Sequence, residues 1–124
     1  MTDPASRAPL LAGALLAALG VALGAFGAHA LRGALDAAAQ GWWQTAVQYQ
    51  MWHALGLLAI GAARVQGGSL PASLLASGTL IFCTTLYAMA LGAPRWLGAV
   101  TPIGGSLMIA GWLVLVWRVA RPRR

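Results

Sequence analysis

Long apolar segments alternate along this chain with short joints that carry glycine, arginine and other polar residues. A helix needs roughly 20 apolar residues to cross the hydrocarbon core of a bilayer. Four segments approach that length, over residues 9–31, 43–63, 70–91 and 97–119. The joints "RGALDAAAQG", "RVQGGS" and "GAPR" suit helical hairpins and leave no room for an extramembrane domain. The pattern predicts an all-α fold, a four-helix transmembrane bundle with short loops that forms a single domain over residues 1–124.

Composition supports this interpretation and excludes a water-soluble fold. Sixty per cent of the 124 residues are hydrophobic and only 8% are charged, whereas an ordinary soluble domain has roughly 25% charged residues. The net charge of +6 would suit a nucleic-acid partner, but the arginines separate apolar segments instead of forming one basic face. Membrane lipids are therefore the expected surroundings, and nucleic acid is not an expected partner.

The arginines also predict the orientation of the bundle. Four spans place both termini on one side, where the arginines would be Arg7, Arg64, Arg118, Arg121, Arg123 and Arg124. The opposite side has only Arg32 and Arg95. Under the positive-inside rule this difference predicts that the N- and C-termini are cytoplasmic. We expect Arg118, Arg121, Arg123 and Arg124 to anchor the tail at the anionic leaflet and set the topology, with a specific anionic-lipid site as the alternative.

The first segment has some features of a secretory signal peptide. Arg7 precedes a run rich in leucine and alanine, and residues 28–30 read Ala-His-Ala. The apolar stretch exceeds the h-region of such peptides, which is usually about 7–15 residues long. We therefore expect this segment to be retained as the first span.

Small residues indicate where the helices pack. Helices already in lipid gain little from further apolar burial and associate through close packing and interhelical hydrogen bonds. The first span has small residues at alternating spacings of four and three, namely Gly13, Ala17, Gly20, Gly24 and Gly27. The fourth span has Gly104, Gly105 and Gly111. These patterns predict close helix packing but leave open whether the partner is a helix of the same chain or another subunit.

Polar side chains within the spans are concentrated in one half of the bilayer. At a rise of about 1.5 Å per residue, His53 lies roughly 16 Å from Arg64, near the midplane. The other candidate polar residues lie toward the outer side, and they are His29, Gln48, Tyr49, Gln50, Thr84, Tyr87 and Thr101. Two interpretations remain open: an interhelical hydrogen-bond network, or a small outward-facing polar pocket around His53.

Several kinds of chemistry are not supported by the residues present. His29 and His53 differ in depth by about 12–15 Å, too far to share one metal or haem iron. A third ligand is missing too, so we expect neither a metal nor another cofactor. Both acids, Asp3 and Asp36, fall outside the spans, and no Ser/His/acid set or nucleophile elbow is present. The sequence therefore does not predict an enzyme.

Four motifs together resemble the family catalogued as domain of unknown function 423. They are "GAFGAHAL" (24–31), "TAVQYQMWHALGLL" (45–58), "LIFCTTLY" (80–87) and "TPIGGSLMIAGW" (101–112). The resemblance implies an integral inner-membrane protein with four helices and no established activity. The positions that match the family pattern are Gly27, His29, Tyr49, Gln50, His53, Tyr87, Pro102, Gly104, Gly105, Gly111 and Trp112. Residues 83–85 depart from it, because Cys-Thr-Thr stands where the family usually has a glycine-containing step.

Two functions follow as hypotheses. The first is a non-enzymatic inner-membrane protein that acts by association, as a homo-oligomer or as a small accessory subunit of a membrane complex. The alternative is a binder or conduit for a small lipid-soluble ligand in the polar pocket around His53. The first depends on the small-residue strip and the minimal loops, and the second on the intramembrane polar residues.

Overall fold

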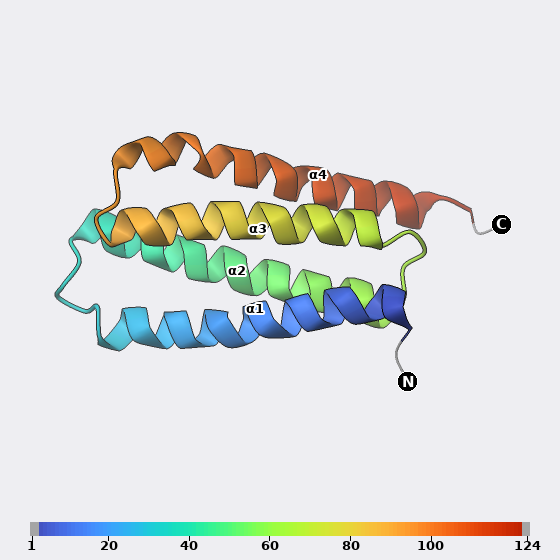
Figure 1. Ribbon diagram of the computed structural model, residues 1–124, viewed down its shortest axis with the longest axis horizontal. Coiled ribbons are helices and arrows are strands. Elements are labelled where there is room, and N and C mark those ends of the chain that lie inside the picture. The colour runs from blue at the N-terminus through green and yellow to red at the C-terminus, as the bar shows by residue number, and fades with distance from the viewer. Residues whose placement is uncertain (1–2, 123–124) are drawn as a thin grey trace.

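The computed structural model describes residues 3–122, and within this range all regular secondary structure is helical. The elements are α1 (Pro4–His29), α2 (Ala37–Ala63), α3 (Ser69–Ala90), the 3₁₀ helix η1 (Arg95–Ala99) and α4 (Thr101–Ala120). Successive α-helices run antiparallel (Figure 1). The predicted four-helix bundle with short loops is confirmed.

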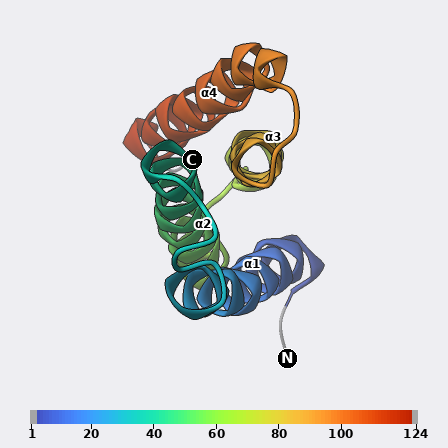
Figure 2. The same cartoon turned by 90° about the vertical axis from the view of Figure 1, so that its left-hand side faces the viewer.

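The bundle has two inner and two outer helices. Viewed along their length, α2 and α3 lie between α1, which packs on α2, and α4, which packs on α3 (Figure 2). The Cα atoms of α1 and α4 do not come within 8 Å of one another in the described range. Each outer helix therefore packs mainly on one helix and keeps a broad exposed face.

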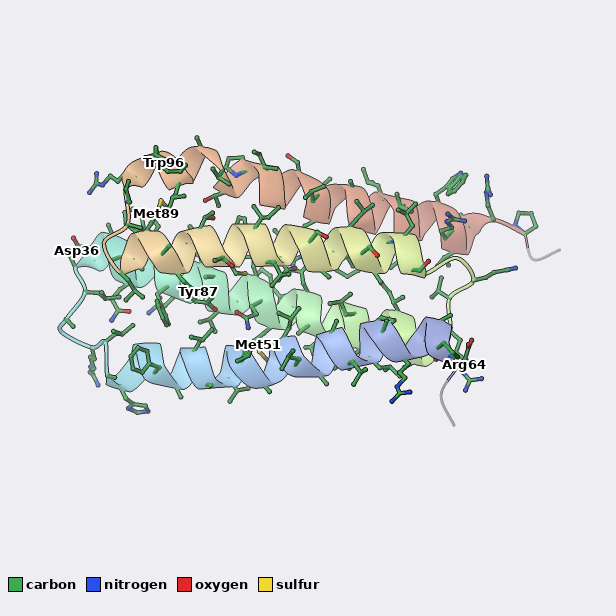
Figure 3. All side chains as sticks on the ribbon, viewed as in Figure 1. Asp36, Met51, Arg64, Tyr87, Met89 and Trp96 are labelled. Atoms are coloured by element: carbon green, nitrogen blue, oxygen red, sulfur yellow. The ribbon has the colours of Figure 1, made fainter. Side chains whose placement is uncertain are left out.

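Both termini lie at the same end of the bundle (Figure 1). Arg64 lies at that end and Asp36 at the opposite one, so these two residues mark the ends of α2 (Figure 3). We refer below to the Arg64 end and the Asp36 end. The connections 30–36 and 91–100 both lie at the Asp36 end.

Two helices begin earlier than the apolar segments suggest, because an aspartate caps each of them. Asp3 accepts a hydrogen bond from the Ala5 amide at 3.3 Å, and α1 starts at Pro4. Asp36 accepts one from the Ala39 amide at 2.8 Å, and α2 starts at Ala37. A side-chain oxygen at this position satisfies an amide that has no carbonyl partner within the helix. Part of the predicted first joint is therefore the first turn of α2.

Three described helical segments are long and apolar enough to cross a membrane, at mean hydropathies of 2.2 for Pro4–His29, 1.5 for Ser69–Ala90 and 1.8 for Arg95–Ala120. Helix α2 is not among them, because its sequence is interrupted by glutamine, tyrosine and histidine. It nevertheless lies alongside α1 and α3 over their full length (Figures 1 and 2). A helix in that position crosses the same layer as its neighbours.

Close packing of α1 on α2 depends on glycines. Gly13, Gly20 and Gly27 are buried at intervals of seven residues along α1, which keeps them on one face of a gently supercoiled pair. A Cβ atom at Gly20 would lie 2.5 Å from the Met51 sulfur. One at Gly13 would lie 2.7 Å from the Ala54 carbonyl oxygen. Of the two partners left open by the sequence, this strip therefore faces the helix of the same chain.

The contact between α3 and α4 is similarly close and also brings backbone against backbone. A Cβ at Gly104 would lie 2.5 Å from the Phe82 amide nitrogen and 2.7 Å from the Gly78 carbonyl oxygen. Further along, a Cβ at Gly111 would lie 2.9 Å from the Leu75 side chain. Gly105 points away from this contact, since its nearest neighbour is Phe82 at 3.9 Å. The close approach on α3 uses Gly78, which the sequence pattern did not single out.

Candidate functional site

Gln50 joins three helices through one buried side chain. Its Nε2 donates to the Leu16 carbonyl oxygen on α1 at 2.9 Å. Its Oε1 accepts from the Tyr87 hydroxyl on α3 at 2.7 Å. Gln50 itself is on α2 and is only 4% exposed. Both ends of the amide therefore have partners, as a buried polar group in an apolar layer requires.

Trp43 repeats this arrangement two turns closer to the Asp36 end. Its indole Nε1 donates to the Leu23 carbonyl oxygen at 2.9 Å. The two donors, Trp43 and Gln50, are seven residues apart on α2, and their acceptors are seven apart on α1. The hydrogen bonds therefore follow the same repeat as the glycines.

The glycines make those two carbonyls accessible. Leu16 and Leu23 each lie four residues before a glycine, Gly20 and Gly27 respectively. In an α-helix the side chain at position i+4 lies beside residue i, so a larger residue there would cover the carbonyl oxygen. A Cβ at Gly27 would overlap the Trp43 indole, whereas one at Gly20 would be in ordinary contact with the Gln50 amide nitrogen, at 3.5 Å, and would overlap the Met51 sulfur. Gly27 therefore provides space for the Trp43 donor, and Gly20 provides space for the Met51 side chain next to Gln50.

His53 connects α2 to α4 and is held in one tautomer. Its Nδ1 lies 2.7 Å from the Tyr49 carbonyl oxygen, which can only accept, so Nδ1 carries the hydrogen. Its Nε2 lies 3.1 Å from the Trp112 indole nitrogen, which can only donate. Both ring nitrogens are therefore satisfied by a neutral imidazole. The Trp112 ring can approach because Gly56 is beneath it, where a Cβ would lie 2.8 Å from the ring.

Two further hydrogen bonds complete the links among the helices. The Thr85 and Thr101 hydroxyls are 2.7 Å apart and join α3 to α4. The Cys83 thiol on α3 donates to the Ala46 carbonyl oxygen on α2 at 3.2 Å. All four helices thus belong to one set of interhelical hydrogen bonds, which we call the polar network: Trp43, Gln50, His53, Cys83, Thr85, Tyr87, Thr101 and Trp112 with their backbone partners.

The structure places the predicted polar residues in two groups. Gln50, His53, Tyr87 and Thr101 are in the polar network. Tyr49 contributes its carbonyl oxygen, and its ring stacks on His53 at 6.0 Å between centroids. His29, Gln48 and Thr84 are exposed, and among residues 3–122 none of these three side chains makes a hydrogen bond.

The predicted tail anchor is described only in part. Arg118 and Arg121 lie over the ring of Trp117, at 5.2 and 3.4 Å from its centroid. Arg123 and Arg124 lie outside the described residues. A tryptophan flanked by two guanidinium groups is typical of a helix end at the headgroup level.

Sequence reasoning missed four members of the polar network as hydrogen-bonding residues, namely Trp43, Cys83, Thr85 and Trp112. Trp43 had a detectable signal, because it stands seven residues before Gln50 and faces the glycine repeat. Trp112 had only its indole N–H, which generally finds a partner when buried. Thr85 and Thr84 are adjacent and chemically identical, so the rotation of α3 alone decides which of them faces α4.

Two surface hollows lie away from His53. The larger, of about 460 Å³, lies between α1 and α2 at the Asp36 end and is lined in part by Gly24, Trp43 and Gln44. The smaller, of about 290 Å³, lies toward the Arg64 end between Ala8 and Ala72. Neither lining includes His53. Among residues 3–122 no group of three or more His, Cys, Asp or Glu side chains is placed to hold a metal ion.

Comparisons with known proteins agree with the four sequence motifs. The family model described as "Protein of unknown function (DUF423)" matches residues 23–105. A UPF0382 membrane protein of Staphylococcus haemolyticus is 45% identical over 113 residues, which cover 86% of this chain and 90% of the relative. The UPF0382 inner membrane protein YgdD of Escherichia coli K12 is 37% identical over 123 residues, covering 96% and 94%. No solved structure matches this chain.

We expect the Gln50–Tyr87 hydrogen bond to contribute measurably to stability. Tyr87→Phe, Gln50→Leu and the double variant form a thermodynamic cycle, measured by unfolding in mild detergent. Interhelical hydrogen bonds in membrane proteins contribute about 0.6 kcal/mol on average and up to about 1.7 kcal/mol, so a coupling in that range is expected. Thr84→Val is the matched control, because Thr84 is exposed and should leave stability unchanged. Additive effects of the two single changes would contradict the assigned hydrogen bond.

We expect the two histidines to differ in tautomer. In ¹⁵N spectra recorded at about pH 8, where imidazole is neutral, His53 should carry its hydrogen on Nδ1. His29 is exposed and serves as the internal reference, because no hydrogen-bond partner among the described residues selects its Nδ1–H tautomer. Trp112→Phe should reduce the preference at His53 and leave His29 unchanged. A His53 signal from the Nε2–H form in the unaltered protein would contradict the geometry described above.

Proposed function

This chain belongs to the DUF423 family of proteins of unknown function, and within that family we propose that it acts by association inside the membrane. It would do so as a homo-oligomer or as a small accessory subunit of a membrane complex, without catalysing a reaction. The relatives are named as membrane proteins and the helices are apolar, so the chain is an integral membrane protein. Its mode of action is the proposed part.

The observation that best supports this proposal is that the buried polar side chains are hydrogen-bonded within the protein. Gln50, His53 and Tyr87 are the residues best suited to bind or transfer something within the membrane, and each is bonded to another helix or to its own backbone. A catalytic or transport role needs polar groups that can exchange their partners for a substrate. Groups that hold helices together instead support a protein that presents a fixed shape to its surroundings.

The outer helices offer the surfaces for such an association. Leu11 and Leu15 on α1 are each 62% exposed, and Leu113 on α4 is 63% exposed. The glycine strip of α1 is turned toward α2, so it does not supply this surface. Because α1 packs mainly on α2 and α4 mainly on α3, their remaining faces are open to lipid or to another helix.

The alternative function, a ligand site around His53, has less support. Both ring nitrogens of His53 already have partners, and the linings of the two hollows described above do not include it. A ligand would have to displace the Trp112 indole to reach Nε2. The geometry therefore favours association over a pocket at this position.

We also propose that both termini are cytoplasmic. The Arg64 end, where the termini lie, has Arg7, Arg64, Arg118 and Arg121, and the Asp36 end has Arg32 and Arg95. The positive-inside rule places the more basic end in the cytoplasm. Alkaline phosphatase fused after Gly33 should be active and the same enzyme fused at the C-terminus inactive, while a C-terminal green fluorescent protein should fluoresce. The reverse pattern would contradict the orientation.

Association is tested by photo-crosslinking in native membranes. A benzophenone amino acid replaces Leu15 on α1, Leu113 on α4 or Leu80 on the exposed face of α3, all of which are more than half exposed. A discrete larger product, either a multiple of this chain or its adduct with a second protein, is expected from Leu113 or Leu15. Leu80, on an inner helix, should give none. The same diffuse labelling at all three positions, or no product at any, would contradict the proposal.

A further inference from the structure

The groove between α1 and α2 at the Asp36 end is lined mostly by residues outside the polar network, and Trp43 is the lining residue that belongs to both. The groove has a volume of about 460 Å³. We propose that this groove binds a glycerophospholipid from the adjoining leaflet, with the lipid phosphate at Arg32 and the ester carbonyls at Gln44 and Gln48. This inference goes beyond the proposed association and does not depend on it.

The two sides of the groove differ in chemistry. On the α1 side, Gly24 and Ala28 present almost no side chain, so a ligand can lie close to the helix backbone there, whereas Gly27 is covered by Trp43. The α2 side includes Trp43 and Val47, which give it an apolar floor. Such a trough suits the start of an acyl chain and the glycerol unit attached to it.

A ladder of glutamines runs along the α2 side. Gln40, Gln44 and Gln48 are four residues apart, so their side chains lie one above the other on a single face. Gln40 donates to the Leu31 carbonyl oxygen at 3.4 Å. Gln44 and Gln48 are exposed, and between residues 3 and 122 their side chains have no hydrogen-bond partner.

The depth of Gln44 and Gln48 in the bilayer determines how much it costs to leave their side chains without hydrogen-bond partners. Counting from Arg64 at about 1.5 Å per residue, Gln48 lies roughly 24 Å and Gln44 roughly 30 Å from the Arg64 end. The hydrocarbon core is about 30 Å thick, so Gln48 lies just inside its far boundary and Gln44 lies at it. An amide left unpaired inside the core, as that of Gln48 would be, is costly. The ester carbonyls of a phospholipid lie at the same depth and accept hydrogen bonds from amide N–H groups.

The charge of the groove selects an anionic group. Arg32 is in the lining, and no aspartate or glutamate is. It belongs to the 30–36 connection, beyond the end of α1, where the headgroups begin. A guanidinium binds a phosphate through paired, charge-assisted hydrogen bonds. Arg32 with Gln40 at the phosphate level, and Gln44 with Gln48 one and two turns deeper, therefore match the order of polar groups along a phospholipid.

The proposal is tested by lipid titration of the full-length, delipidated protein, followed by native mass spectrometry. The probes are dioleoylphosphatidylglycerol, its diether analogue without ester carbonyls, and inorganic phosphate. The variants are Arg32→Ala, Gln44→Leu and Gln48→Leu, with Arg95→Ala and Gln66→Leu as matched controls outside the groove. All five side chains are exposed, and none of these changes removes a hydrogen bond of the polar network.

We expect each groove variant to weaken binding of the diester lipid about tenfold, and each control to change it less than about twofold. The diether analogue should bind the unaltered protein about tenfold more weakly. Arg32→Ala should weaken its binding further, whereas Gln44→Leu and Gln48→Leu should not. This pattern assigns the phosphate to Arg32 and the ester carbonyls to the glutamines.

Three outcomes would overturn the inference. Equal lipid binding by the groove variants and the control variants would show that the protein retains lipid non-specifically and not in this groove. Displacement of the lipid by millimolar inorganic phosphate would indicate a site for the free anion. Loss of a dimer in Gln44→Leu and Gln48→Leu, with lipid binding unchanged, would show that a second copy of this chain covers the ladder instead. The first two results leave the proposed association untouched, and the third would overturn the lipid site while supporting association, so the two proposals fail separately.

Discussion

The structure depends on one constraint, which is that a polar side chain inside the bilayer needs a partner from another part of the protein. Helix α2 concentrates the problem, because it is the helix whose composition alone does not qualify it to cross a membrane. The bundle solves it by surrounding α2 with acceptors and donors: the Leu16 and Leu23 carbonyls on α1, Tyr87 on α3 and Trp112 on α4. The most polar helix thus becomes the one that links the other three.

Glycine packing and hydrogen bonding are two aspects of the same interface. The Leu23 carbonyl accepts the Trp43 indole N–H at a place where a Cβ at Gly27 would overlap that indole. A larger residue at position 27 would therefore hold Trp43 away and leave its N–H unpaired. Glycines, hydrogen-bond acceptors and donors therefore share a seven-residue repeat for a physical reason. Close packing at the glycines and hydrogen bonding to the carbonyl oxygens both require the backbones of α1 and α2 to lie close together.

The glutamines of α2 illustrate how position on a helix separates roles. Gln50 is buried between three helices, whereas Gln44 and Gln48 face the groove with no partner in the described chain. Gln48 and Gln50 are two residues apart, which places them on nearly opposite faces of the helix. One face accounts for the stability of the bundle, and the other accounts for the lipid site that we propose.

The four helices, the family and the polar half of the bundle were predictable from sequence, because hydropathy and motifs are properties of each segment by itself. The partners were not. Only the rotation of α3 decides that Thr85 and not Thr84 bonds Thr101, and only the crossing of α2 and α4 brings Trp112 to His53 and selects its tautomer. The sequence pattern of the glycine strip on α1 also did not indicate which helix packs against it, and only the structure shows that this helix is α2. A segment's preference for lipid depends on its own atoms, whereas a hydrogen bond between helices depends on where a second segment places its atoms.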